Sequence, residues 1–154
     1  VNRFHKKTQN ELASLGLPPG CALNNPIDTP GGSISVENGA MAERIMEIVY
    51  ANENIHAFVM HLNIPVLMRQ VMTGQDFLKN LMDGADRVES RYPGRTHFLL
   101  VLRSDGRAEI NNKKCVAREW ALSKGYPVFD ELTNAGNAIS AISKHELFCA
   151  NRRK

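Results

Sequence analysis

The chain has 154 residues, of which 43% are hydrophobic and 23% are charged, and its formal net charge is +3. This length suits one domain, and this composition excludes a wholly disordered chain, which would need fewer apolar residues and more net charge. No apolar run approaches the roughly 20 residues of a membrane span, and no long basic stripe carries interleaved aromatic residues, so neither a membrane nor nucleic acid is an expected partner.

The first third of the chain is expected to contain two helices separated by a strand and a loop. Thr8 and Glu11 have the spacing of a helix-capping box, and Gly16 stands where a short helix would stop. Residues 1–20 are therefore interpreted as a peripheral helix and linker. A brief strand, a loop shaped by prolines and glycines, and a longer helix are expected at residues 21–23, 24–32 and 35–51.

From residue 56 onward, strands and helices alternate. The run at 96–103, Thr-His-Phe-Leu-Leu-Val-Leu-Arg, is the clearest strand, because a parallel strand covered on both faces is largely apolar. The strands are expected at 56–62, 96–103 and 126–129, and the helices at 68–92, 110–123 and from Thr133, the predicted cap, onward. Gly74 and Gly84 suggest a bend or a break in the first of these helices. The residues expected to face the core from the last two helices are Val116, Trp120, Ala121, Ala138, Ile139, Ile142 and Leu147.

This alternation implies right-handed crossovers and a parallel sheet. The expected fold class is α/β, three-layered, with a mostly parallel sheet of about three to four strands. We expect a single domain over residues 1–154. So small a sheet leaves an edge that needs cover, from the N-terminal segment or from another domain.

Common catalytic and nucleotide-binding motifs are absent from the sequence, including GxxxxGK[ST], GxGxxG and GxSxG. Gly31 and Gly32 precede a predicted helix, where their amides could bind an anion or could simply allow a loop conformation, and the second interpretation is preferred. His56 and His61 are five residues apart, which places them on opposite faces of a strand. No metal site is therefore expected.

Two acidic residues, Asp105 and Asp130, directly follow predicted strands, at the edge where open α/β sheets bind ligands. Asp28 would join this edge if its loop follows a strand. Acidic residues in such places are usually turn formers and helix caps. We therefore assign no catalytic residue.

The cysteines indicate a reducing compartment. Cys21, Cys115 and Cys149 are widely spaced, odd in number and without a CxxC pair, which argues against a disulfide framework. The N-terminal residues are polar and lack the apolar core of a signal peptide. The expected location is the cytoplasm.

The order of several segments resembles one enzyme family. Leu-Asn-Asn-Pro-Ile-Asp-Thr-Pro-Gly-Gly at 23–32 precedes an amphipathic helix, and the later segments are 54–60, 96–103 and Ser-Lys-Gly-Tyr-Pro-Val-Phe at 123–129. In this order they resemble the flavodoxin-like ligase-CoA domain of the NDP-forming acyl-CoA synthetases, relatives of succinyl-CoA synthetase. The resemblance extends from Thr8 to about residue 145, and its most specific part is Asn-Pro-Ile-Asp at 25–28.

The resemblance implies an acid–CoA ligase. In that reaction a nucleoside triphosphate phosphorylates a histidine on another domain, the phosphate moves to an acid, and CoA displaces it to form a thioester. The whole enzyme would use CoA, ATP or another nucleoside triphosphate, and Mg²⁺, none of them bound by this domain alone. The implied partners are CoA-binding and ATP-grasp domains or subunits. A homo-oligomer is a further possibility.

Within this domain, the resemblance implies a scaffold and part of the wall of the phosphate site. That wall would be formed by Asn25, Asp28, Gly31 and Gly32. The family's serine–histidine–threonine–glycine-like motif is absent, so no histidine here inherits the phosphohistidine role, and the isolated chain is expected to be inactive. The family's leading strand and glycine turn are also missing, so an incomplete flavodoxin-like domain is expected.

Two alternatives belong to other functional classes. A non-catalytic flavodoxin-like module could bind a partner through its sheet edge or its helical methionines, which are Met41, Met46, Met72 and Met82. A receiver-like phosphoacceptor would need acidic residues after the first strand, and the segment 56–62 ends without one. The acid substrate and the nucleotide are not specified by the sequence.

Overall fold

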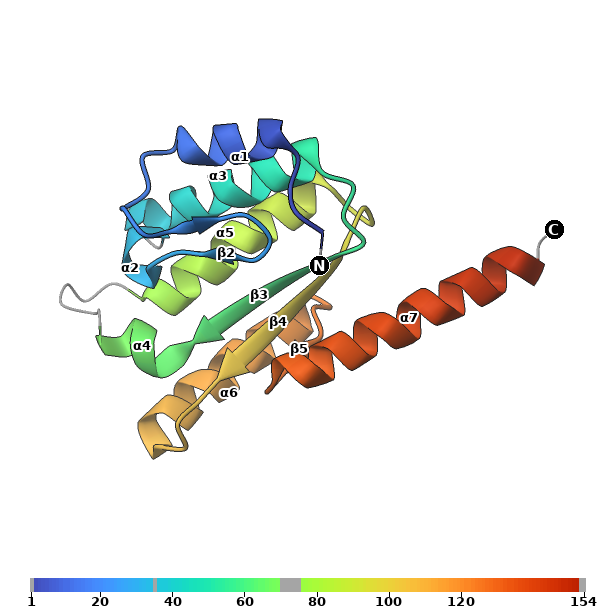
Figure 1. The fold of residues 1–154 in the computed structure, drawn as a ribbon. Helices are drawn as coiled ribbons and strands as arrows, with labels where there is room; N and C mark the ends of the chain where they lie inside the picture. Colours follow the sequence, from blue (N-terminus) through green and yellow to red (C-terminus); the bar gives the residue numbers. More distant parts are fainter. Residues whose placement is uncertain (1, 35, 70–75, 153–154) are drawn as a thin grey trace. The chain divides into compact units, whose positions relative to one another are not determined.

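The computed structural model describes residues 2–34, 36–69 and 76–152. Two compact units make up the chain: Val1–His56 with Pro65–Thr96, and Ala57–Ile64 with His97–Lys154. Figure 1 labels the helices and strands of both units. None of the helices in the described residues is long and apolar enough to cross a membrane.

The first unit is largely helical. Its elements are α1 (Lys6–Ala13), β1 (Ala22–Leu23), β2 (Ile27–Asp28), α2 (Gly31–Ile34), α3 (Val36–Asn52), α4 (Ile64–Arg69, which begins at the last residue of the second unit's first segment) and α5 (Phe77–Arg91). Helices α3 and α5 pack against each other. Their buried residues recur at helical spacing and include Ile45, Met46, Val49, Leu78, Leu81, Ala85 and Val88, which confirms the helix predicted at 35–51.

Two glycines bring the backbones of α3 and α5 into direct contact. The start of α3 is kinked, because Glu37, Asn38 and Gly39 have left-handed backbone angles, with φ of 52°, 56° and 81°. A Cβ atom on Gly39 would lie 2.2 Å from the Asn80 carbonyl oxygen, and one on Gly84 would lie 3.0 Å from the Gly39 carbonyl oxygen. Gly84 therefore marks a close approach between helices, and α5 continues through it without the predicted break.

The helix predicted at 68–92 is in fact shorter. Met68 belongs to α4, and α5 starts at Phe77, where the Asp76 carboxylate accepts a hydrogen bond from the Lys79 amide at 3.0 Å. Such an N-cap satisfies a backbone donor that a helix leaves unpaired, and periodicity alone did not reveal it. The predicted features at Met72 and Gly74 lie outside the described residues.

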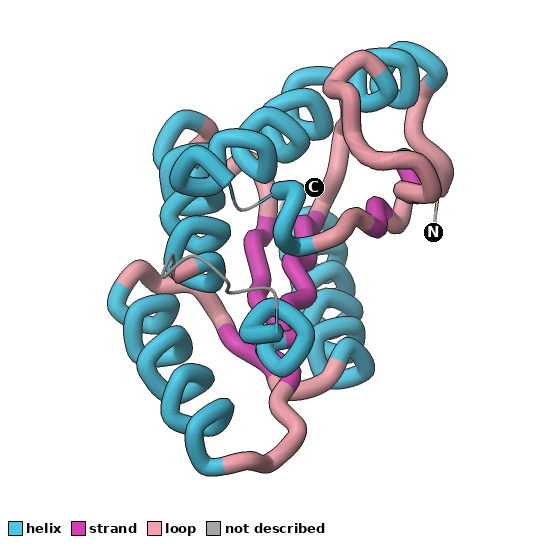
Figure 2. Tube along the Cα trace, turned by 90° about the vertical axis from the view of Figure 1, so that its left-hand side faces the viewer, coloured by secondary structure: helices cyan, strands magenta, loops and turns pink. Residues whose placement is uncertain are grey.

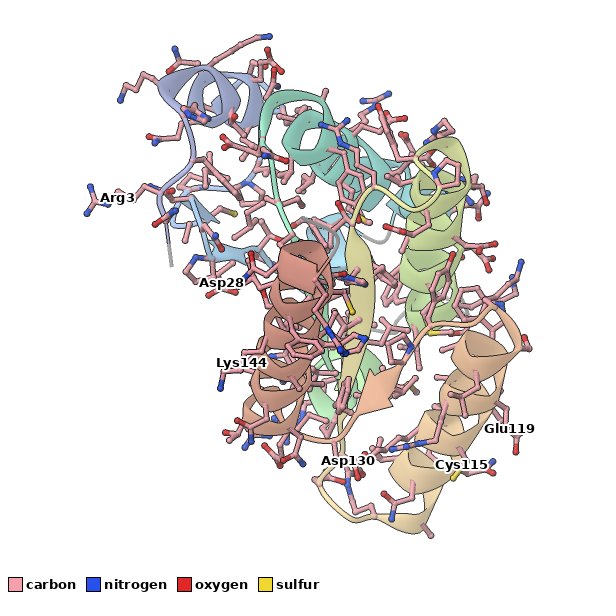
Figure 3. All side chains as sticks on the ribbon, turned by 90° about the vertical axis from the view of Figure 1, so that its right-hand side faces the viewer. Arg3, Asp28, Cys115, Glu119, Asp130 and Lys144 are labelled. Atoms are coloured by element: carbon pink, nitrogen blue, oxygen red, sulfur yellow. The ribbon has the colours of Figure 1, made fainter. Side chains whose placement is uncertain are left out.

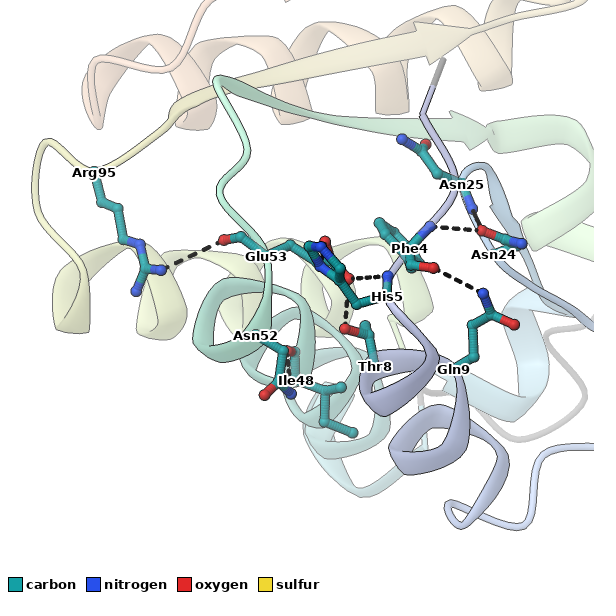
Figure 4. A network of polar contacts seen from close by, with 10 residues as sticks. All are labelled: Phe4, His5, Thr8, Gln9, Asn24, Asn25, Ile48, Asn52, Glu53 and Arg95. Carbon is teal, nitrogen blue, oxygen red and sulfur yellow. Dashed lines mark hydrogen bonds and ion pairs between the residues drawn. The ribbon is translucent and has the colours of Figure 1, made fainter.

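A buried carboxylate, Glu53, fixes the N-terminal segment to the end of α3 (Figure 4). Its Oε1 accepts hydrogen bonds from the His5 amide at 2.7 Å and the Thr8 hydroxyl at 2.5 Å, and its Oε2 lies 2.8 Å from His5 Nδ1. Thr8 is therefore a buried residue inside α1, and the predicted capping role is wrong, since His5 occupies the N-cap position. Burial would raise the pKa of Glu53, but the donors on Thr8 and His5 outweigh burial and lower it.

The second unit contains a parallel sheet. Its elements are β3 (Ala57–Asn63), β4 (His97–Arg103), α6 (Ala108–Ser123), β5 (Val128–Phe129) and α7 (Leu132–Arg152). The strand order is β3-β4-β5, with Ala57 opposite His97, Asn63 opposite Arg103 and Leu100 opposite Val128. The strands are drawn in magenta in Figure 2. All three predicted strands are confirmed, and the three-stranded parallel sheet with flanking helices is compatible with a flavodoxin-like α/β fold.

Some core assignments on α6 and α7 are wrong. The buried residues of α6 are Ile110, Ala117 and Ala121, so Ala121 is confirmed. Val116, one residue and about 100° of helical rotation before Ala117, is 61% exposed.

The last helix also differs from expectation. Helix α7 begins at Leu132, so Thr133 lies inside the helix and does not precede it as a cap. Ala135 is the residue buried on α7, Ala138, Ile139 and Ile142 are half-buried, and Leu147 is 63% exposed. Apolar residues therefore recur at helical spacing along α7 beyond the part of the helix that other residues bury.

Replacing Gly39 by alanine should destabilise the protein strongly. The new methyl group would overlap the Asn80 carbonyl oxygen, and the left-handed backbone angle alone costs about 1–3 kcal/mol for a residue with a side chain. Gly16→Ala is the matched control, because Gly16 has a φ of +69° with nothing within 4 Å of its Cβ position. Urea unfolding should show a clearly larger loss of stability for Gly39→Ala than for Gly16→Ala, and equal losses would contradict the backbone contact.

Replacing Glu53 by glutamine should cost about 1–3 kcal/mol of unfolding free energy at pH 7, because a buried acceptor set is disrupted. The folded-state pKa of Glu53 is lowered from 4.5, so its contribution is fully present above pH 4.5 and is lost as the pH falls through the lowered value. The difference between wild type and variant in urea unfolding should therefore narrow in acid. Glu119→Gln, on the exposed face of α6, is the control, and a constant gap from pH 7 to pH 3 would contradict this assignment.

Candidate functional site

The segment singled out by sequence forms a small hairpin in the first unit. Strands β1 and β2 pair antiparallel, with Ala22 opposite Asp28 and Leu23 opposite Ile27. The predicted strand at 21–23 is thus confirmed, but it belongs to a two-stranded sheet of its own. Asp28 is a residue of β2, with an exposed side chain (Figure 3), and β2 is a strand of this hairpin and not of the parallel sheet.

The loop of this hairpin is held by one side chain. Asn24 Oδ1 accepts hydrogen bonds from the amides of Phe4 and Asn25, each at 2.9 Å (Figure 4). Asn25 is exposed, and the Asn25–Pro26 peptide bond is cis. The loop is therefore attached to the same N-terminal segment that Glu53 anchors, and its exposed side chains do not form these contacts.

Gly31 and Gly32 are the first two residues of α2, which has only four residues. The Ser33 amide donates to the Pro30 carbonyl oxygen at 2.9 Å, which closes the turn. So short a helix offers little aligned dipole for an anion. The four predicted wall residues therefore lie close together along the chain, on the hairpin and the turn that follows it.

A second polar group lies at the carboxyl end of β4, in the second unit. Ser104 Oγ donates to Asn111 Oδ1 at 2.6 Å and accepts from the Gly106 amide at 3.1 Å. Asp105 accepts from the Arg107 amide at 3.2 Å and from Arg107 Nε at 2.8 Å. Partial burial would raise the pKa of Asp105, but these bonds from Arg107 lower it overall. Asp105 is a turn former that starts α6, as the sequence suggested.

At the end of β5, one carboxylate contacts two cations of α6 (Asp130 is labelled in Figure 3). Asp130 lies 2.8 Å from Lys114 Nζ and also pairs with Arg118, one helical turn further along α6. The hydrogen bond from Lys114 is the main reason that the pKa of Asp130 is lowered. Asp130 is therefore an ionised acceptor and no proton donor at neutral pH. The charges of these three side chains sum to +1.

Lys114 and Arg118 were not identified from the sequence. A usable signal was present, since two cations four residues apart on a helix share a face, and Asp130 follows the next strand. The pairing of β4 with β5, which brings the end of β5 beside α6, could not be read from the sequence.

Histidines and free thiols also occur outside these groups. His61 is exposed on β3, and His97 Nε2 lies 2.9 Å from Glu146 Oε1 of α7. All three cysteines are free thiols. Cys149 Sγ lies 3.5 Å from His145 Nε2 on α7. None of these groups, within the described part of the chain, combines a nucleophile, a base and an orienting third residue.

Comparison with known proteins shows the fold and no family. No family model matches the chain, and no curated protein matches it. The crystal structure of PH0766 from Pyrococcus horikoshii OT3 is similar, with a TM-score of 0.56 and 20% identity over 84% of this chain and 26% of that chain. The present chain therefore corresponds to about a quarter of the length of that protein, and the two share an α/β fold.

Proposed function

We propose that the chain is part of the three-layer, flavodoxin-like ligase domain of an NDP-forming acyl-CoA synthetase. The whole enzyme would join an acid to CoA through a phosphohistidine on another domain. This chain would supply scaffold and part of the wall beside the phosphate. CoA-binding and ATP-grasp domains or subunits would complete the active site.

The observation that carries this proposal is the parallel sheet β3-β4-β5, with polar loops at its carboxyl end. The segments that resemble the family fall on the corresponding elements: 54–60 leads into β3, 96–103 contains β4, and 123–129 contains β5. The segment 25–28 forms the hairpin turn and β2 ahead of the long helix α3. The likeness to PH0766 supports the fold only.

The chemistry of the polar groups is compatible with a phosphate wall. In the first unit, the exposed Asp28 carboxylate would face a phosphate only with a bridging cation. Mg²⁺ is commonly bound by one or two carboxylates together with phosphate oxygens, so Asp28 fits that part. Asn25, Gly31 and Gly32 would shape the wall around it.

One departure from the family limits the role of this chain. Strand β3 leads directly into α4, which has six residues. In the succinyl-CoA synthetase branch that the chain resembles, the corresponding strand leads into a glycine loop and a helix whose N-terminus faces the phosphate. The chain therefore supplies side chains at the wall and leaves that loop to other parts of the enzyme.

The alternative function is a non-catalytic interaction module. Large apolar side chains are exposed on the helices of the second unit, and these are Val116, Leu122, Leu132, Leu147 and Phe148. Such side chains favour a protein–protein contact where they form a contiguous patch. The same surface would also serve a domain that docks with other parts of a ligase, so it does not by itself favour a module without catalysis.

The isolated chain, incubated with CoA, ATP or GTP, Mg²⁺ and a panel of small acids, should form no thioester, because it contains no phosphohistidine motif. The complete gene product, or the chain together with the CoA-binding and ATP-grasp subunits encoded beside it, should form a thioester from at least one acid. Thioester formation by this chain alone would contradict the proposal, as would the absence of those domains from the complete gene and its neighbours.

In the complete enzyme, Asp28→Asn should lower kcat about tenfold or more if Asp28 helps to hold Mg²⁺ at the phosphate. Asp83→Asn on α5 is the matched control and should leave kcat unchanged, because Asp83 pairs with Lys79 on the same helix. The rate should be measured at saturating Mg²⁺ and nucleotide. An unchanged kcat for Asp28→Asn would remove Asp28 from the proposed wall without affecting the assignment of the fold.

A further inference from the structure

The last turns of α7 carry two metal-binding side chains on adjacent positions of one helix face. Cys149 and His145 are four residues apart, and the Cys149 Sγ atom lies 3.5 Å from the His145 Nε2 atom. Cys149 is a free, half-buried thiol, and His145 is exposed. Residues at this spacing face the same direction on a helix, so both donor atoms can reach one ion.

The separation of the two atoms fits a tetrahedral zinc ion. Zinc binds thiolate sulfur at about 2.3 Å and imidazole nitrogen at about 2.0–2.1 Å, and a tetrahedral angle then places the two donors about 3.6 Å apart. The observed 3.5 Å requires almost no rearrangement. We propose that His145 and Cys149 form half of a zinc site that a second copy of this chain completes.

A second copy is needed because α7 itself supplies only two of four ligands. Glu146, the neighbouring carboxylate, lies 2.9 Å from His97 Nε2 of β4 and is thus directed toward the sheet. A twofold axis through the ion would place the partner's identical pair opposite, which gives two imidazoles and two thiolates around the metal. This ligand set is common in structural zinc sites, and the two thiolates cancel the charge of Zn²⁺.

The surface beside this pair suits a contact between helices. Phe148 is 57% exposed and directly precedes Cys149, so it would be partly buried by a second α7. Ala141 lies one turn before His145, is exposed, and is small enough for a close approach of two helices. A twofold contact uses the same residues on both copies, so this single stripe is sufficient.

The charges on the same stretch explain why the metal is required. Lys144 and Arg152 carry positive charge near the contact, and the Arg152 guanidinium lies 5.3 Å from the centre of the Phe148 ring (Lys144 is labelled in Figure 3). Two copies would bring these cations together and repel each other. Metal coordination would outweigh that repulsion, so the dimer should depend on zinc.

The full chain, kept reduced with a phosphine, should be titrated with Zn²⁺ and followed by sedimentation velocity. It should be monomeric in EDTA and dimeric with zinc, with saturation at one zinc ion per two chains. In parallel, Co²⁺ should give the intense visible bands of a tetrahedral site and a thiolate charge-transfer band in the near ultraviolet. Circular dichroism of each variant checks that α7 remains helical.

Three variants make the test specific. Cys149→Ser and His145→Ala should each abolish zinc-dependent dimerisation, and Cys149→Ser should also remove the charge-transfer band. Cys115→Ser is the matched control, because this exposed cysteine of α6 should not contribute. Phe148→Ala should weaken the zinc-dependent dimer while the tetrahedral cobalt spectrum is retained at high protein concentration.

Several results would overturn the proposal. Saturation at one zinc ion per monomer without a change in mass would remove the second copy from the site. A dimer of the reduced chain that persists in EDTA would show that zinc is not required for the contact. A zinc dimer that survives in Cys149→Ser, or that is lost in Cys115→Ser, would place the site elsewhere.

Discussion

The parallel pairing of β3 with β4 is the constraint on which the described site depends. The two strands are in register from Ala57 opposite His97 to Asn63 opposite Arg103. Parallel strands cannot be joined by a tight turn, so the chain must leave the sheet after β3 and return to start β4. Strand β5 then joins β4 through Leu100 and Val101 alone. This arrangement decides which loops share the carboxyl end of the sheet, and therefore that Asp130 meets the cations of α6.

Two carboxylates, Glu53 and Asp130, have lowered pKa values for different reasons and serve different ends. Glu53 is buried and accepts hydrogen bonds from Thr8 and His5, so its charge is satisfied within a fixed network. Such a group stabilises a fold and offers nothing to a ligand. Asp130 is exposed and pairs with the long, flexible side chains of Lys114 and Arg118, which solvent can also reach. An anion can compete for those cations at modest cost, which is why an exposed pair is the better candidate for function.

The sequence predicted the strands well because β3 and β4 are long apolar runs, and a central parallel strand requires such a run. The prediction failed where the buried face of a helix shifts by one residue, and where the role of a residue depends on a partner far away in the sequence. The inward face of α6 uses Ala117 where Val116 was expected, a rotation that local hydrophobicity does not resolve. Thr8 has the spacing of a capping residue, and only the approach of Glu53 reveals its buried role. The candidate wall residues stand on one short segment, and the pairing of that segment as a separate hairpin follows from contacts that a linear pattern does not contain.

The second unit is assembled from two separate stretches of chain. Its strand β3 comes before the second stretch of the first unit in the sequence. Each unit is therefore interrupted by the other, and the polypeptide crosses between them at 56–57, 64–65 and 96–97. A fragment that starts at His97 would lack β3 and expose one whole edge of β4, whose residues 98–102 are buried in the intact chain. Anyone who divides this protein for expression, limited proteolysis or fragment complementation therefore needs β3 joined directly to β4. The segment Pro65–Thr96 between them belongs to the first unit and has to be removed before the second unit can stand alone.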